Sequence, residues 1–351
     1  MSSTQRDWDA FLEGRGAARI DGALAAFGGP ESAPRAARDA TVLVDLSHCS
    51  IIRAAGPDAT TFLNGQLTCD VREASETRSL LGAWCSPKGR MLAVFRLWRA
   101  QDAYLLQLPR VLCADILKRL RMYVLRAKVA LETLDDTHVC FGVAGPRAAA
   151  LLEKSVGEAP TSDNGVAVVG GGVTVLRIAG AHARFAFVAP FPEAQRLWIA
   201  LERDARPAGA AVWDWHDVAA GIPVVLSATS DKFLPQEANL DLLGGVSFTK
   251  GCYVGQEIVA RVHYRGRVKQ RMYRAHVATK TAPTPGEPIY TPELPDQASG
   301  TVVLAAPAPE GGHDLIAVIY SDRANQKLCL GSPTGAPLSV ETLPYTITDV
   351  S

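Results

Sequence analysis

A run of three β-type segments constrains the fold of this 351-residue chain most strongly. Residues 80–84 and 90–98 have the composition of strands and flank a turn at 86–89, and residues 104–108 add a third segment. Strands joined by such short connections run antiparallel. A helix is expected next over 111–125, where apolar residues recur at helical spacing. This mixture of antiparallel strands and separate helices predicts an α+β fold.

The C-terminal part of the chain has a different texture. After Arg274, short β-type runs are separated by Pro and Gly up to about residue 341. This spacing indicates a small antiparallel barrel or sandwich. Earlier in the chain, Ala-Gly-Pro at 55–57 and again at 144–146 ends a β segment and opens a helix. The recurrence suggests a duplicated strand-turn-helix unit.

Charge, cysteine usage and the N-terminus limit the class of protein. The 36 basic and 36 acidic residues cancel, and no run of 18 or more apolar residues would span a membrane. The N-terminal sequence is polar with early acidic residues, unlike a secretory or transit peptide, so we expect a cytoplasmic protein. The seven cysteines are scattered without a CxxC pair, which predicts reduced thiols and neither a disulfide framework nor a metal site.

One cysteine has an unusual local setting. Residues 250–261 read KGCYVGQEIVAR, so Cys252 lies between Lys250 and further cations downstream. Positive charge near a thiol favours the thiolate, and the flanking glycines let the backbone turn tightly and leave the sulfur uncovered. We therefore predict that Cys252 is a functional thiol, with Lys250 favouring its ionised form. His263 is the nearby candidate base.

The same segment carries a family resemblance. The pattern K-G-C-Y-x-G-Q-E-x-x-A-R resembles the signature of the YgfZ family. These proteins are folate-binding-type relatives of the glycine-cleavage T-protein, involved in iron–sulfur cluster assembly and tRNA modification. The resemblance extends to AGIP at 220–223, FLPQ at 233–236, GGVSF at 244–248 and FLNGQLTCDV at 62–71, and it covers roughly residues 42 to 275.

The resemblance implies three subdomains in a cloverleaf around a central opening, the last of them an antiparallel β-barrel. We expect residues 1–40 to form a loosely ordered arm, because they are rich in Ala, Gly, Pro and Arg beyond one short helix. Residues 41–205 are expected to form a folate-binding-type α+β region of two interleaved subdomains. Residues 206–270 would return to complete them and carry the cysteine motif, and residues 271–351 would form the barrel.

The chain departs from the T-protein where that enzyme has its catalytic acid. Aminomethyl transfer requires a carboxylate at the folate nitrogen. The corresponding window at 89–99 contains no acidic residue, and Ala93 falls near the expected position. We therefore expect no aminomethyltransferase catalysis. The alternative is a tetrahydrofolate-dependent one-carbon transferase that uses Asp70 or Asp217 in place of the missing acid.

The resemblance also implies a bound tetrahydrofolate or related folate. A pterin is held by aromatic stacking and by a carboxylate, and its glutamate tail favours cations. Trp213 stands where the family has a folate-associated tryptophan, and Asp217 is the nearest acid because Ala219 replaces the usual Glu. A second family tryptophan is replaced by Cys49. The remaining residues assigned to this site are Gln256, Glu257 and Arg261.

A basic strip follows the motif. From Arg261 to Arg274 there are six cations and no acidic residue, interleaved with aromatic side chains. Such a strip can hold phosphates and stack bases, so Arg265, Arg267 and Lys269 are predicted to bind tRNA or the folate tail. A solvated strand with alternating charges is the alternative.

The function predicted from these residues is that of an accessory or scaffold protein. Cys252 alone cannot complete an iron–sulfur cluster, which needs about four ligands. We therefore expect it to engage clusters or client enzymes only transiently, in support of iron–sulfur enzymes that include those of tRNA methylthiolation. A one-carbon transferase and a tRNA-binding module are the two alternatives.

Overall fold

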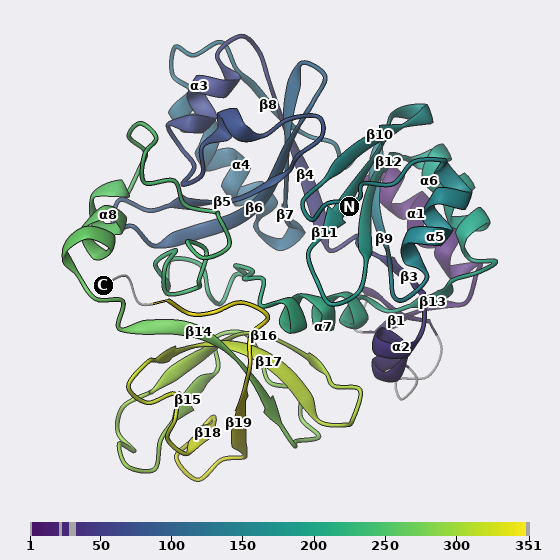
Figure 1. Ribbon diagram of the computed structural model, residues 1–351. Coiled ribbons are helices and arrows are strands. Elements are labelled where there is room, and N and C mark those ends of the chain that lie inside the picture. Colours follow the sequence, from purple (N-terminus) through teal and green to yellow (C-terminus); the bar gives the residue numbers. More distant parts are fainter. Residues whose placement is uncertain (1, 21–22, 28–32, 349–351) are drawn as a thin grey trace.

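The computed structural model describes residues 2–20, 23–27 and 33–348, which form three lobes around a central junction (Figure 1). One lobe contains a five-stranded sheet, the second a six-stranded sheet and the third a closed six-stranded barrel. Helices lie beside the two sheets, so the predicted α+β class and terminal barrel are confirmed.

The first sheet has the strand order β5-β6-β7-β4-β8 and contains the predicted meander. Its strands are β4 (Cys49–Ala55), β5 (Leu80–Cys85), β6 (Met91–Ala100), β7 (Ala103–Pro109) and β8 (Ala130–Thr133). Its helices are α3 (Ala59–Asn64), the short η1 (Val71–Glu73) and α4 (Arg110–Val124). Strand β6 is buried from Met91 to Trp98. Its nearly continuous apolar sequence is typical of a strand that is covered on both faces. The charged exception in this run is Arg96.

The second sheet has the order β10-β11-β12-β9-β3-β13. Its strands are β3 (Val42–Asp45), β9 (His138–Ala144), β10 (Val166–Val169), β11 (Val173–Ile178), β12 (Arg184–Pro190) and β13 (Arg206–Ala208), with the turn η2 (Gly170–Gly172). Helices α5 (Ala148–Val156) and α6 (Phe191–Leu201) contact β12. Strand β3 precedes the whole first sheet in sequence yet pairs with β9, and β13 adds to it in parallel. The two sheets are thus interleaved along the chain.

The N-terminal segment is more ordered than its composition suggests. It contains α1 (Ser3–Glu13), the hairpin of β1 (Ala17–Ile20) and β2 (Ala23–Phe27), and α2 (Ala33–Asp39). Trp8 and Leu12 are fully buried in the core of the second sheet, and the Trp8 indole N–H donates to Asp45 Oδ1 at 2.8 Å. The short helix expected in this segment is thus present as α1, anchored by two apolar side chains one helical turn apart, whereas the expectation of a loosely ordered arm after it is corrected by β1, β2 and α2. Residues 21–22 and 28–32 lie outside the described residues.

The barrel closes in the order β14-β17-β16-β15-β18-β19. Its strands are β14 (Gln270–Val277), β15 (Pro288–Tyr290), β16 (Gly300–Pro307), β17 (His313–Tyr320), β18 (Leu328–Leu330) and β19 (Pro337–Glu341). Alternate residues of β14, such as Ala275 and Val277, fill the interior together with Val302 and Leu315.

Two further helices connect the lobes. Helix α7 (Ala210–Ala220) lies at the junction, and α8 (Gln256–Arg265) lies at the outer edge of the first sheet (Figure 1). Helix α7 ends at Gly221, whose φ of 62° places it in the left-handed region. A Cβ atom there would also approach the side chains of Leu343 and Tyr345 to within 2.7–2.9 Å, so glycine is required. None of the helices in the described parts of the chain is long and apolar enough to cross a membrane.

Candidate functional site: a cavity between the lobes and an exposed cysteine turn

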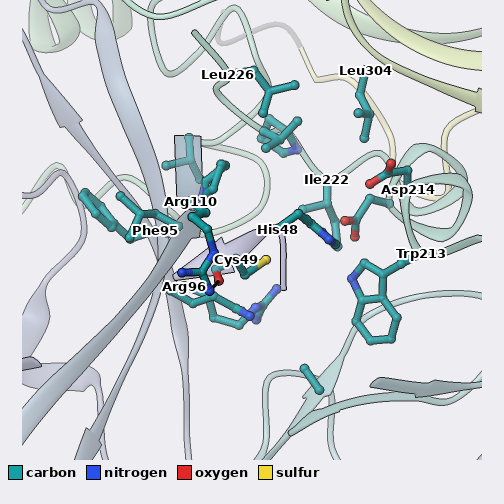
Figure 2. A pocket seen from close by; sticks show the side chains of 18 of the residues that line it. His48, Cys49, Phe95, Arg96, Arg110, Trp213, Asp214, Ile222, Leu226 and Leu304 are labelled. Atoms are coloured by element: carbon teal, nitrogen blue, oxygen red, sulfur yellow. Dashed lines mark hydrogen bonds between the residues drawn. The ribbon is translucent and has the colours of Figure 1, made fainter. Parts of the chain in front are cut away.

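A cavity of about 620 Å³ lies where the three lobes meet (Figure 2). Its walls come from β6 and β7 of the first sheet, Ile178 and Ala186 of the second, α7, the segment 222–226, and Leu304 of the barrel. Most of the lining is apolar. The charged or titratable side chains that reach it are His48, Cys49, Arg96, Arg110, Asp214 and Asp217. Largely apolar cavities of this size with a few polar groups are typical of small-molecule sites.

Helix α7 lines this cavity with Ala210 and with three larger side chains. Trp213, Asp214 and Asp217 share one face because residues three and four apart are neighbours on a helix. The Trp213 ring edge lies against β9, where a Cβ on Gly142 would come within 2.3 Å of Cζ3. The Arg184 guanidinium lies 5.2 Å from the Trp213 ring centroid. Trp213 is therefore a fixed wall of the cavity, only 6% exposed.

The two aspartates on this face have different environments. Asp217 Oδ1 pairs with Nη2 of the fully buried Arg184 at 2.7 Å, so its charge is compensated. No described residue donates a hydrogen bond to Asp214. Burial, and then the negative charge of Asp217, raise the pKa of Asp214 to about 7. Asp214 is thus a carboxyl group that can hold or release a proton near neutral pH.

The opposite wall carries His48, Cys49 and two arginines. The apolar surroundings of the cavity raise the pKa of the Cys49 thiol well above its usual value. Arg96 donates to Asn164 Oδ1 at 2.7 Å, and burial lowers its pKa to about 10, so it remains protonated.

Arg110 is held by several acceptors at once. It donates to the carbonyls of Ser47 and Cys49 at 2.5 and 2.9 Å, and to Asp135 Oδ2 at 2.8 Å. A fourth bond, to Gln5 Oε1 at 3.2 Å, links it to α1. The N-terminal helix thus helps to fix this wall of the cavity.

The sequence predicted Trp213 and Asp217 at this site, and the structure places both in the cavity wall with Cys49. The sequence-based prediction did not include His48, Arg96, Arg110 or Asp214. Helical spacing from Asp217 could have found Asp214, and the lone charge in the apolar run of β6 could have found Arg96. Nothing local in the sequence singles out His48 or Arg110, since only the tertiary fold brings them together.

The cysteine motif lies elsewhere. All seven cysteines fall within the described residues, and Cys252 is the exposed one, outside the cavity lining. The Lys250 ammonium is buried and donates to the carbonyls of Asn64, Leu67 and Cys69 at 2.5, 2.6 and 2.9 Å. The predicted role of Lys250 beside the Cys252 thiol is therefore corrected. Its three hydrogens are all used to fasten the motif to the end of α3.

Burial lowers the pKa of Lys250 to about 8. The three carbonyl acceptors favour the ammonium, because a neutral amine has only two hydrogens to donate. Lys250 is thus a structural cation at the base of the motif.

The turn that follows Cys252 packs on the β5–β6 turn of the first sheet. Gly255 has a φ of 81°, and a Cβ there would lie 2.4 Å from the Ser86 carbonyl oxygen. Gln256 Oε1 accepts from the Tyr253 N–H at 3.3 Å, and Glu257 pairs with Arg261 at 2.8 Å on the exposed face of α8. These three predicted folate residues, Gln256, Glu257 and Arg261, do not line the cavity.

Comparison with known proteins identifies the family. The family description "GCVT N-terminal domain" matches residues 26–189. Proteins named tRNA-modifying protein YgfZ from Enterobacter sp. and Cronobacter sakazakii are each 32% identical to the chain, over 91% of it and 97% of their own length. The chain belongs to the YgfZ family.

The fold of this YgfZ-family chain is also that of a solved T-protein. The glycine cleavage system aminomethyltransferase T of Bartonella henselae superimposes with a TM-score of 0.80, covering 98% of this chain and 97% of that protein. At 18% identity the match shows a shared fold and no more. It confirms the predicted T-protein-like cloverleaf.

The basic strip of this YgfZ-family chain is not one continuous face. Arg271 is fully buried and pairs with Asp241 at 2.8 Å, and Arg274 pairs with Glu341 at 2.8 Å. The predicted continuity from Arg261 to Arg274 is therefore wrong, because the chain changes from helix α8 to barrel strand β14 within it. Four of the six cations remain exposed, namely Arg261, Arg265, Arg267 and Lys269.

Two other predicted candidates lie outside the cavity. Asp70 caps η1 and pairs with Arg72, and His263 stacks on Phe248 with ring centroids 3.6 Å apart. No hydrogen bond joins His263 to Cys252 in the described residues. Within the same residues, no group of three or more His, Cys, Asp or Glu side chains is arranged to hold a metal ion.

Proposed function

We propose that this protein is a folate-binding accessory protein of tRNA modification in the cytoplasm, and that it supports iron–sulfur client enzymes through Cys252. The observation that carries the proposal is the separation of two features. A cavity with an unpaired carboxyl group lies at the lobe junction, and an exposed cysteine lies on a turn outside it. The relatives named tRNA-modifying protein supply the context.

The residues of the cavity fit a reduced folate. A pterin presents adjacent N–H groups, and Asp214 offers them a carboxyl group that no described residue occupies. Apolar side chains such as Phe95 and Leu226 suit the faces of a flat heterocycle. Asp217 is neutralised by Arg184 and shapes the wall beside Trp213. A bound folate would supply one-carbon chemistry or act as a regulatory ligand.

The exposed thiol suits transient exchange. One cysteine supplies one ligand, so a cluster at Cys252 would need ligands from a client protein or a small thiol. Exposure on a turn makes Cys252 accessible to such a partner, whereas the Cys49 thiol faces the cavity and has a raised pKa. We therefore assign delivery or repair of iron–sulfur species to Cys252.

One observation favours a second candidate function, a tetrahydrofolate-dependent one-carbon transferase. A carboxyl group with a pKa near 7 is suited to general acid or base catalysis, and Asp214 has that property inside the cavity. Asp70 lies outside the cavity and Asp217 is ion-paired, so Asp214 is the acid that such an enzyme would use.

A titration with tetrahydrofolate tests the proposal. Binding should change the fluorescence of Trp213, and Asp214→Asn should weaken binding at least tenfold while Asp70→Asn leaves it unchanged. Turnover of an aminomethyl donor that depends on Asp214 would favour the transferase. Absence of binding by the folded wild-type protein would contradict the folate site.

A cellular assay tests the thiol. Cys252→Ser should lower the content of methylthiolated nucleosides in tRNA, with the abundance and melting temperature of the protein unchanged. Thr249→Ser, a conservative change in the same exposed segment, is the matched control. Full methylthiolation in Cys252→Ser cells would contradict the assigned role.

A further inference from the structure

The folded chain brings two further cations beside the exposed part of the basic strip. The β5–β6 turn and α8 contact each other, since a Cβ on Gly89 would lie 3.0 Å from Ile258 Cβ. This contact brings two cations from the turn beside four from α8 and the loop after it. We call them the α8 surface, composed of Lys88, Arg90, Arg261, Arg265, Arg267 and Lys269. All six are exposed.

The α8 surface is strongly positive although the chain as a whole is neutral. Glu257 is the acidic residue in its two segments, and it pairs with Arg261. At its border, Asp231 accepts from the Ser86 hydroxyl and Glu237 accepts from the Leu234 N–H. When Asp231 and Glu237 are counted, the surface has six cations and three acidic residues. No ion pair within the described residues engages the other cations of the surface.

An aromatic platform stands within this surface. Tyr264 is 65% exposed. Its ring meets His263 edge-on at 4.7 Å between centroids, and His263 stacks on Phe248 at 3.6 Å. The stack beneath limits the motion of the exposed ring. Aromatic rings interleaved with cations are the means by which proteins hold single-stranded nucleic acid, because bases stack while phosphates pair with Arg and Lys.

We propose that the α8 surface binds a single-stranded RNA segment, with a base stacked on Tyr264 and phosphates held by the surrounding cations. Duplex RNA is disfavoured because its bases are already stacked on one another and cannot reach the ring. We assign the single-stranded segment to a loop of tRNA, and this assignment rests on the proposed function. The surface itself is independent of the cavity and of Cys252.

Binding of a fluorescent single-stranded RNA of about 12 nucleotides tests the charges. We expect two double variants to bind at least tenfold more weakly than the wild type, namely Arg265→Glu/Arg267→Glu and Lys88→Glu/Arg90→Glu. Affinity is measured at salt concentrations from about 50 to 200 mM. The logarithmic salt slope should fall by roughly 0.7 for each phosphate that the variant no longer neutralises. The Lys88 and Arg90 pair is decisive, because the linear sequence gives no reason to link it to α8.

A matched control has the same charge change elsewhere. Arg203→Glu/Lys327→Glu alters exposed residues after α6 and before β18, remote from α8 in Figure 1. This control should bind as the wild type does. Equal weakening in the control, or unchanged affinity in both test variants with their melting temperatures preserved, would overturn the proposal.

The stacking role has its own test. Tyr264→Ala should weaken single-stranded binding about fivefold or more, whereas Tyr264→Phe, which keeps the ring, should not. Duplex RNA of equal length should bind more weakly than the single strand. Equal affinity for the duplex, or preferential binding to phosphatidylglycerol vesicles, would overturn the assignment to single-stranded RNA. Asp214→Asn should leave RNA binding intact, so failure of the folate site and failure of this surface are distinguishable.

Discussion

At the scale of single residues, the chemistry of the cavity is set by two aspartates on one helical face. Asp217 compensates the charge of the buried Arg184, and Asp214 has no partner among the described residues. The proximity of Asp217 and the burial of Asp214 both disfavour ionisation of Asp214. Substitution by Asn therefore has opposite consequences at the two positions.

Asp214→Asn should stabilise the protein at alkaline pH. The pKa of Asp214 rises from 3.8 to about 7 on folding, so between those values the folded carboxyl group keeps a proton that the unfolded one has lost. Its contribution to stability is full below about pH 4 and is lost as the pH rises through 7. Since Asn stays neutral, the variant should gain up to about 4 kcal/mol over the wild type at pH 8 and little at pH 4. Thermal unfolding across pH measures this difference.

Asp217→Asn supplies the opposing comparison. It leaves the fully buried Arg184 without its carboxylate, so it should destabilise the protein by about 3 kcal/mol or more. If Asp214→Asn and Asp217→Asn shifted the melting temperature in the same direction and by the same amount at pH 8, the different environments described for the two acids would be refuted.

Lys250 and Cys252 have separate roles despite their proximity in sequence. Lys250→Met should cost about 2 kcal/mol or more in unfolding free energy, because three buried carbonyls lose their donor. Cys252→Ser should cost little, since the side chain is exposed. In folded Lys250→Met protein, alkylation of Cys252 should proceed at the wild-type rate and faster than that of the six other cysteines. A slower rate there would restore the thiolate-activating role of Lys250.

At the scale of elements, α7 serves two lobes. One face carries Trp213, Asp214 and Asp217 to the cavity, and the other meets the barrel through Trp215, whose indole N–H donates to Asp314 Oδ2 at 2.8 Å. Asp314 is nearly buried and also bonds His276 Nδ1 at 2.8 Å. The barrel thereby fixes the rotation of the helix that lines the cavity.

Asp314→Ala should loosen this contact. The Trp215 N–H and His276 both lose their acceptor, which should destabilise the fold by about 2 kcal/mol. Folate affinity should fall as well, although Asp314 does not line the cavity. Asp314→Asn keeps one oxygen acceptor for Trp215 and should have the smaller effect on both. Equal effects of the two substitutions on folate affinity would argue against positioning through Trp215.

Elements with strong local patterns could be predicted from the sequence. The meander over 80–108, the following helix and the barrel all have periodicity and turn residues that act locally. The order of the N-terminal segment beyond its short helix was undervalued because its average composition is weak, whereas two buried side chains, Trp8 and Leu12, anchor it. The cavity required tertiary knowledge. His48 comes from the turn before β4, Arg96 from β6 and Arg110 from α4. The basic strip divides because β14 enters the barrel at Gln270.

At the scale of the whole molecule, the C-terminal tail ties the lobes together. The Tyr345 hydroxyl donates to the Gly221 carbonyl at the end of α7 at 2.8 Å and accepts from Asn239 at 3.3 Å. Asn239 in turn donates to the Met272 carbonyl of β14 at 2.7 Å. Tyr345 and Asn239 together thus connect the end of the cavity helix to the barrel.

Removal of residues 343–351 should uncouple the barrel from the sheets. Five of the six tryptophans are buried in the cores of the two sheet lobes and the sixth, Trp215, bonds to the barrel, so tryptophan fluorescence reports mainly on the sheets, whereas far-UV circular dichroism also reports on the barrel. The two signals should follow one transition in the full chain and separate in the truncated one, with the dichroism change at lower temperature. Tyr345→Phe removes only the hydrogen bonds of the hydroxyl group. The separation between its two transitions should lie between that of the full chain and that of the truncated chain, with a loss of about 1 kcal/mol in unfolding free energy. Coincident transitions in the truncated chain would show that α7 and the core shared with the first sheet hold the barrel in place without the tail.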